Sequence, residues 1–132
     1  MLRCLEVQQF ALVEHLQIEF DDGLNLLTGE TGSGKSILVD ALSLLLGEKA
    51  HAAMIRTGAE KAVVTGLFQT AGATELYARL QAAGIEHDGD EVVTKREISQ
   101  SGKGRAFLNN QLVAVGFLKE MARFLAKTFN LQ

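Results

Sequence analysis

The chain has 132 residues, of which 47% are hydrophobic, so it can bury one compact core and hardly two. Its formal net charge of -3 excludes a globally basic surface for nucleic acid, and its single cysteine, Cys4, lies in an alternating segment typical of a buried reduced thiol. No apolar run of about 18 residues and no secretory signal pattern occur, which favours a cytoplasmic protein. We therefore expect one globular domain, or one lobe of something larger.

The first half of the chain combines short strands with one apolar helix. Alternating apolar residues predict strands at 2–9 and 13–20, and a turn then leads into a short apolar strand at 24–28. From Ser36 onward the apolar residues cover most of a helix surface, until Gly47 supplies a C-terminal stop. A helix this apolar is expected to be buried on more than one side.

The second half is predicted to be mainly antiparallel strands with two helices. The expected elements are, in chain order, a strand at 63–69, a helix at 74–83 ended by Gly84, strands at 91–98 and 104–109, a helix at 117–127 and the start of a strand at 128–131. The phenylalanines expected in the core are Phe10, Phe20, Phe68 and Phe107. Together with the first half, this pattern predicts an α/β fold.

The segment before the first helix has the pattern of a phosphate-binding loop. Residues 29–36, Gly-Glu-Thr-Gly-Ser-Gly-Lys-Ser, fit G-x-x-x-x-G-K-[ST] and lie between a predicted strand and a predicted helix, as the motif requires. Glycines let backbone N–H groups converge on phosphate, and the helix N-terminus adds the positive end of its dipole. We expect Lys35 to reach the β and γ phosphates and the Ser36 hydroxyl to bind Mg²⁺.

The residues expected to cradle the triphosphate of a nucleotide are Gly29, Glu30, Thr31, Gly32, Ser33, Gly34, Lys35, Ser36 and Ile37. The alternative is a glycine-rich turn without a ligand. A hydrolase of this class also needs an acidic residue at the end of an apolar strand. Asp88, Asp90 and Glu91 precede the apolar residues of their segment, so a solvated loop is favoured there over a metal site. The chain is expected to bind nucleotide better than it hydrolyses it.

Several segments resemble the RecN family of bacterial DNA-repair ATPases, which are relatives of the SMC proteins. These segments are QQFAL at 8–12, TGETGSGKS at 28–36, VDALSLLLG at 39–47, IRTGA at 55–59, KREIS at 95–99 and GKGRAFLNN at 102–110. The chain departs from the family pattern at Gln9, Ser33 and Asn110. The resemblance covers nearly the whole chain.

The resemblance implies a P-loop NTPase of ABC type, with residues 1–132 forming the N-terminal lobe of an SMC-like head and its antiparallel β subdomain. The coiled coil and the C-terminal lobe, which carries the signature motif and the Walker B acid, would lie outside this sequence. Hydrolysis would then need that C-terminal lobe and a second head in a homodimer. The full-length protein would engage DNA ends in double-strand break repair and recombination, associated with the nucleoid. We also expect an exposed apolar patch where the second lobe would pack.

The resemblance also suggests roles for residues outside the loop. At the end of the chain, Gln132 matches the family's glutamine that contacts Mg²⁺ and the attacking water. Arg56 lies where SMC-type heads carry an arginine near the phosphates, with a surface arginine in an ion pair as the alternative. Four basic residues fall on the hairpin predicted at 91–109, namely Lys95, Arg96, Lys103 and Arg105. They would either contact DNA phosphates or form a solvated face.

A second class of function stays open on the sequence, namely a small self-contained P-loop kinase or nucleotide hydrolase. A kinase would continue after the loop with short βαβ units, whereas residues 60–110 are predicted to be antiparallel strands with one helix. A GTPase would carry an Asn-Lys-x-Asp guanine-binding run, which does not occur in this sequence.

Overall fold

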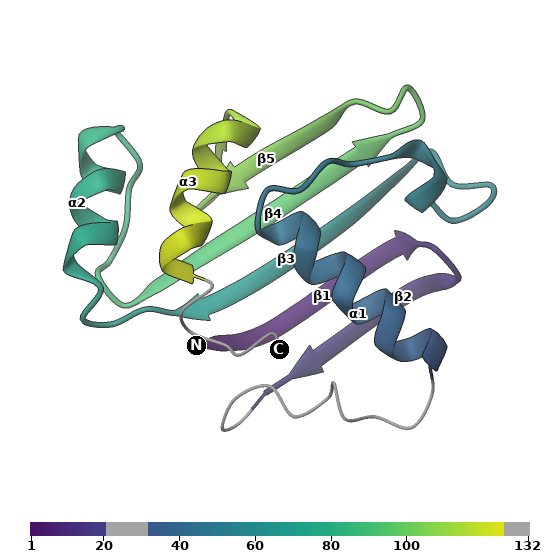
Figure 1. Ribbon diagram of the computed structural model, residues 1–132, viewed down its shortest axis with the longest axis horizontal. Helices are drawn as coiled ribbons and strands as arrows, with labels where there is room; N and C mark the ends of the chain where they lie inside the picture. The colour runs from purple at the N-terminus through teal and green to yellow at the C-terminus, as the bar shows by residue number, and fades with distance from the viewer. Residues whose placement is uncertain (21–31, 126–132) are drawn as a thin grey trace.

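The computed structural model describes residues 1–20 and 32–125, and for residues 32–36 it describes the backbone. Its strands form one six-stranded sheet of order β2-β1-β3-β4-β5-β6, in which every neighbouring pair is antiparallel (Figure 1). The strands are β1 (Leu2–Phe10), β2 (Val13–Glu19), β3 (Lys61–Gln69), β4 (Glu91–Ser99), β5 (Gly104–Leu108) and β6 (Gln111–Val113). The helices are α1 (Gly32–Leu45), the short 3-10 helix η2 (Ala52–Met54), α2 (Thr74–Ala82) and α3 (Val115–Leu125). No helix among these is long and apolar enough to cross a membrane.

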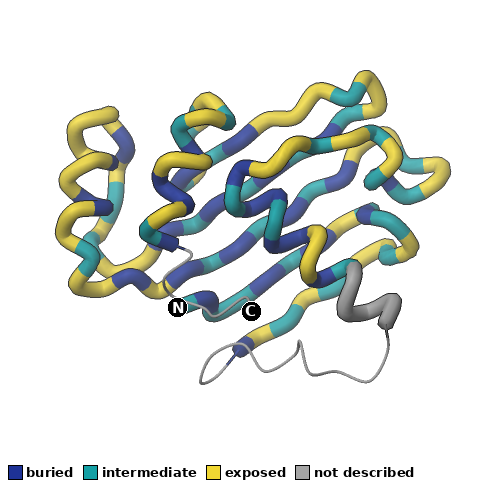
Figure 2. Tube along the Cα trace, in the orientation of Figure 1, coloured by how far each residue is buried: buried dark blue, intermediate teal, exposed yellow. Residues whose placement is uncertain are grey.

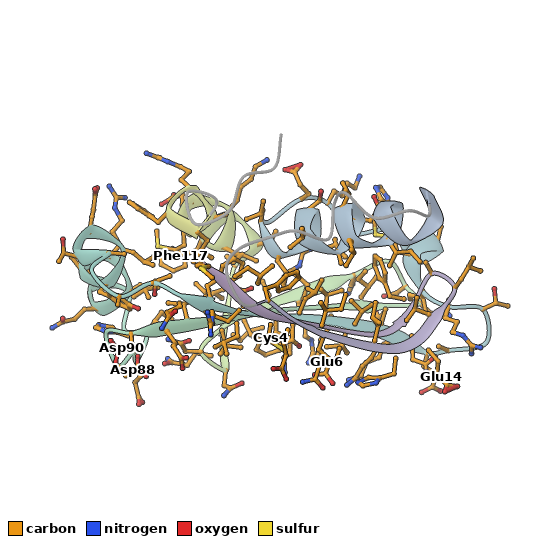
Figure 3. All side chains as sticks on the ribbon, turned by 90° about the horizontal axis from the view of Figure 1, so that it is seen from below. Cys4, Glu6, Glu14, Asp88, Asp90 and Phe117 are labelled. Carbon is orange, nitrogen blue, oxygen red and sulfur yellow. The ribbon has the colours of Figure 1, made fainter. Side chains whose placement is uncertain are left out.

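The described helices lie on one face of the sheet, and among the described residues no element covers the other face, which we call the open face. Figure 3 shows α1, α2 and α3 on the same side, with Cys4 and Glu6 of β1 pointing to the opposite side. Buried and partly exposed residues therefore alternate along β3 and β4 (Figure 2), because successive side chains of a strand point to opposite faces. The alternation is less regular along β1, whose pairing with β3 shifts between Leu2 and Cys4. Cys4 is a free thiol that is only half-buried, so the expectation of a buried cysteine is wrong.

Helix α1 crosses the covered face and packs closely on β3. Leu42, Leu44 and Leu45 are at most 1% exposed, in agreement with the prediction of a deeply buried helix. Close approach is possible because β3 carries Gly66, where an added Cβ would lie 2.6 Å from Cδ1 of Leu45. The helix ends at Leu45, just before the predicted stop at Gly47, whose φ of +92° is a conformation that glycine adopts readily.

Most predicted elements are present, with ends that differ by a few residues. Helix α1 begins at Gly32 rather than at Ser36, and α3 begins at Val115 rather than at residue 117. Strand β6 was not predicted, because the three residues of Gln111–Val113 are too short to show a period. The strands predicted at 24–28 and 128–131 lie outside the described residues.

One of two expectations about apolar residues is corrected by the structure. Phe10, Phe20 and Phe68 are buried as predicted, but Phe107 is half-buried on the open face, because its neighbours in β5 occupy the covered one. No single cluster accounts for the large exposed hydrophobic residues of the described chain, which are Leu12 at the β1–β2 turn, Val39 on α1 and Leu112 on β6, opposite Phe107. The expected apolar patch stays a prediction.

Candidate nucleotide-binding site

The phosphate-binding motif ends in the first turn of α1. The helix begins at Gly32, so the backbone of Gly-Ser-Gly-Lys-Ser, residues 32–36, is helical, and its first turn contains no acidic residue. The first four N–H groups of a helix have no partner within the helix, and the positive end of its dipole favours an anion there. This start of α1 fits a phosphate group. Gly29, Glu30 and Thr31 lie outside the described residues, and the side-chain contacts expected of Ser33, Lys35 and Ser36 stay predictions.

The direction of α1 is fixed by one apolar stripe. Leu38, Leu42 and Leu45 are at most 8% exposed and recur at helical spacing on the side that faces the sheet. Ile37, the last residue of the predicted cradle, is half-buried and packs against the same core. Its side chain therefore helps to anchor the start of α1, and its place in the cradle stays a prediction.

Arg56 lies at the end of the sheet where α1 begins. Its backbone N–H donates to the carbonyl of Gln9 at 2.8 Å, next to the β1–β2 turn, and Figure 1 shows that turn at the same end of the sheet as the start of α1. A hollow of about 220 Å³ beside the turn is lined by Ala11, Leu12, Arg56 and Thr57. This placement is compatible with the role expected of Arg56, whereas Gln132 lies outside the described residues.

The basic hairpin is only partly available to a ligand. Arg96 is 2% exposed and points to the helix-covered side, where its Nη1 donates to the carbonyls of Leu44 and Glu48, each at 2.9 Å. Both alternatives expected for Arg96, contact with DNA phosphates and a place on a solvated face, are therefore wrong, because its side chain lies on the buried side of β4. Lys95 is on the open face, with Nζ 4.5 Å from the centroid of the Phe107 ring.

Lys103 and Arg105 are the members of the predicted basic cluster that remain exposed. They line a hollow of about 260 Å³ together with Lys61, Glu97, Ile98 and Ser99. Glu97 Oε2 lies 3.9 Å from Nζ of Lys61 and 3.8 Å from Nζ of Lys95, so part of the positive charge is already paired. For Lys103 and Arg105, both alternatives given by the sequence, contact with DNA phosphates and a solvated face, remain compatible with this arrangement.

The acidic residues at 88–91 stabilise a turn. Oδ1 of Asp88 accepts hydrogen bonds from the backbone N–H groups of Asp90 at 2.8 Å and Glu91 at 3.0 Å. These bonds hold the pKa of Asp88 below its ordinary value of 3.8. Within residues 1–20 and 32–125, no group of three or more His, Cys, Asp or Glu side chains is placed to hold a metal ion. The expectation of a loop at residues 88–91 agrees with the two backbone hydrogen bonds that Asp88 accepts.

The comparison with known families decides the assignment. Residues 4–132 match the AAA domain family. The chain belongs to that family. The protein called DNA repair protein RecN in Halalkalibacterium halodurans is 41% identical over 125 residues, which are 95% of this chain and 22% of that protein. The RecN of Synechocystis sp. is 45% identical over 92% of this chain and 21% of its own length. The predicted resemblance to the RecN family is confirmed, and the chain spans about a fifth of these relatives.

Solved structures confirm the predicted fold class. The SMC head domain from Thermotoga maritima has a TM-score of 0.61 and 25% identity, covering 90% of this chain and 41% of that one. A chain solved in work on ATP-driven dimerization and DNA-stimulated activation of SMC ATPases has a TM-score of 0.71 and 23% identity, covering 93% and 78%. A RecF structure has a TM-score of 0.67 and 21% identity, covering 89% of this chain and 29% of that one. The fold of this AAA-family chain is thus that of SMC-like, ABC-type P-loop ATPases.

Proposed function

We propose that the chain is the ATP-binding lobe of a RecN-like ATPase that acts in DNA double-strand break repair and recombination. The observation that carries this proposal is that the last residues of the GETGSGKS motif form the first turn of a helix whose apolar residues pack in the core. The relatives named for DNA repair, which match nearly the whole chain, support the biological role. Because the full-length protein would act on DNA ends, we expect it in the cytoplasm, associated with the nucleoid.

In this proposal, residues 29–37 surround the phosphates of ATP. Glycines at positions 29, 32 and 34 let backbone N–H groups approach the phosphates, and Lys35 neutralises charge on the β and γ groups. The Ser36 hydroxyl would be one ligand of Mg²⁺. When bound, Mg²⁺ would neutralise the charge that develops on the phosphates.

Hydrolysis requires more than this lobe in our proposal. Arg56 would approach the phosphates from the side of the β1–β2 turn, and Gln132 would contact Mg²⁺ and the attacking water. The C-terminal lobe of the same protein would supply the signature motif and the Walker B acid, and a second head in a homodimer would close the site. DNA would be engaged by the full-length protein.

The alternative, a self-contained kinase or nucleotide hydrolase, is less compatible with the fold. Such enzymes build their sheet from βαβ units with parallel strands. All strand pairs between β1 and β6 are antiparallel. We therefore keep the head-lobe proposal.

Thermal unfolding with and without Mg-ATP tests the proposed function. A ligand that binds only the folded state raises Tm in proportion to the logarithm of its concentration over Kd. We expect millimolar Mg-ATP to raise the Tm of the chain and to leave the Tm of Lys35→Ala unchanged. A chain whose Tm does not respond to Mg-ATP would contradict the proposal.

A further inference from the structure

Arg96 joins the central strand β4 to the far end of the phosphate-binding helix. Its guanidinium is almost fully buried, and the single nitrogen Nη1 donates to two carbonyls, those of Leu44 and Glu48, each at 2.9 Å. Leu44 lies in the last turn of α1, which ends at Leu45, and Glu48 follows Gly47 in the chain that leaves the helix. One side chain therefore holds both the last turn of α1 and the chain that leaves it.

The electrostatics of this contact explain why a buried charge is retained there. The last carbonyls of a helix lack partners within the helix and carry the negative end of its dipole, so a cation is favoured beside them. Burial lowers the pKa of Arg96, and its Nε is buried without a partner among the described residues. The two carbonyls are therefore the polar contacts that hold the guanidinium at the end of α1.

The surroundings leave little room for the end of α1 to shift. A Cβ added to Gly104 of β5 would lie 3.2 Å from Nη2 of Arg96 and 3.4 Å from Cβ of Ala50. A Cβ added to Gly47 would lie 2.8 Å from Cα of Lys119 in α3. Strands β4 and β5 and helix α3 therefore enclose the C-terminal end of α1.

We propose that Arg96 is a positioning residue for nucleotide binding, because it fixes the C-terminal end of α1 and so aims the N-terminus at Gly32. This inference rests on the proposed ATP-binding function. A helix of 14 residues is about 21 Å long, so a tilt of about 5° at the fixed end displaces the other end by about 2 Å. Displacements of about 1 Å at reacting groups cost up to about 100-fold in rate. Phosphate contacts made by the helix start depend on the same geometry.

The test compares Arg96→Met with Thr94→Val, at a temperature where circular dichroism shows both variants folded. Thr94 is a matched control because it is fully buried on the same face of β4 and its Oγ1 has no partner among the described residues. Calorimetry gives the Kd for Mg-ATP. Hydrogen exchange without nucleotide reports on the amides of Leu46, Gly47 and Glu48, which donate to carbonyls of α1.

We expect Arg96→Met to weaken Mg-ATP binding about tenfold and to speed exchange at residues 46–48, with Thr94→Val at wild-type values in both. Arg96→Lys, which keeps the charge, should recover part of both losses. Wild-type affinity in a folded Arg96→Met overturns the positioning role, even where exchange is faster. Should Arg96→Met not fold, wild-type affinity and exchange in Arg96→Lys overturn it. A wild-type chain that does not bind Mg-ATP contradicts the proposed function, whereas the exchange data still decide whether Arg96 holds α1.

Discussion

Cδ1 of Leu45 on α1 lies 2.6 Å from the position that a Cβ on Gly66 of β3 would occupy. The helix that begins at the phosphate-binding motif therefore rests directly on strand backbone, with no side chain from position 66 between them. A closer approach buries more apolar surface per residue and limits the movement of α1 over the sheet.

This contact predicts that Gly66→Ala destabilises the fold. The added methyl group overlaps Cδ1 of Leu45, so this buried side chain, the helix or the strand must shift, and overpacking of this kind costs about 1–3 kcal/mol. The free energy of unfolding, measured by urea denaturation, checks the prediction. Gly116→Ala in α3 is the control, because its added Cβ meets nothing within 4 Å, and we expect it to be neutral or stabilising by up to about 1 kcal/mol. Equal stability of the two variants would contradict the close contact.

Tyr77→Phe is expected to lower stability by about 1 kcal/mol at neutral pH. The Tyr77 hydroxyl of α2 forms a buried hydrogen bond with Oγ1 of Thr70, and its removal leaves a polar group without that partner. Thr65→Val on the open face is the control, with a change within about 0.5 kcal/mol expected. Urea denaturation at pH 7 measures both changes.

The same pair predicts a change in stability at alkaline pH. Burial raises the pKa of Tyr77 above its ordinary value of 10.0, so its contribution is present below pH 10 and is lost as pH rises through the folded-state pKa. Tyr77 is the single tyrosine of the chain, and the difference between wild type and Tyr77→Phe therefore isolates it. We expect this difference to shrink between pH 9 and pH 12. A constant difference over that range would contradict the prediction.

Asp88→Asn tests whether the charged Asp88 carboxylate stabilises the turn before β4, and the test compares stability at neutral and acid pH. Hydrogen bonds from the backbone of Asp90 and Glu91 lower the pKa of Asp88, so its contribution is present above its ordinary pKa of 3.8 and is lost as pH falls through the folded-state value. We expect wild type to be more stable than Asp88→Asn at pH 7 and the difference to vanish at lower pH. Chemical denaturation at several pH values measures this, and an unchanged difference at pH 7 and pH 2 would refute the role of the charge.

Arg56→Ala is expected to weaken Mg-ATP binding. A charge-assisted hydrogen bond to phosphate contributes about 1.5 kcal/mol, so its loss corresponds to about a tenfold increase in Kd. The control is Arg79→Ala, because Arg79 pairs with Glu75 on α2. Calorimetry on both variants checks the prediction. Equal Kd values for Arg56→Ala and wild type would favour the alternative of a surface arginine.

The sequence predicted those features that rest on strong local patterns. The alternation in β3 and β4 and the apolar run of α1 located these elements closely, because each buries one face and repeats its period several times. The motif at 29–36 identified the candidate site for a similar reason, since its glycines and Lys35 have a fixed spacing.

Arg96 and Phe107 show why other features could not be predicted. The face of the sheet to which each side chain points depends on which residues of its strand face the helices. In most strands the residues that face the core are apolar, so a charged residue such as Arg96 is not expected among them. The sequence of β4 did contain a sign of this burial. Val92, Thr94 and Ile98 are spaced from Arg96 by even numbers of residues, so they lie on the same face, and all three are buried. Which carbonyls would accept from Arg96 depends on how α1 crosses the sheet, and no local pattern contains that information.

Mg-ATP binding measured by calorimetry on the chain and on Lys35→Ala, with phosphate release followed in the same samples, tests the central proposal most directly. We predict binding of one nucleotide per chain that is lost in Lys35→Ala, with negligible release of phosphate by either protein. Equal affinity in both proteins would contradict the assignment of the phosphate-binding loop. Rapid, Lys35-dependent phosphate release by the purified chain would instead show a complete active site within these 132 residues and overturn the head-lobe proposal.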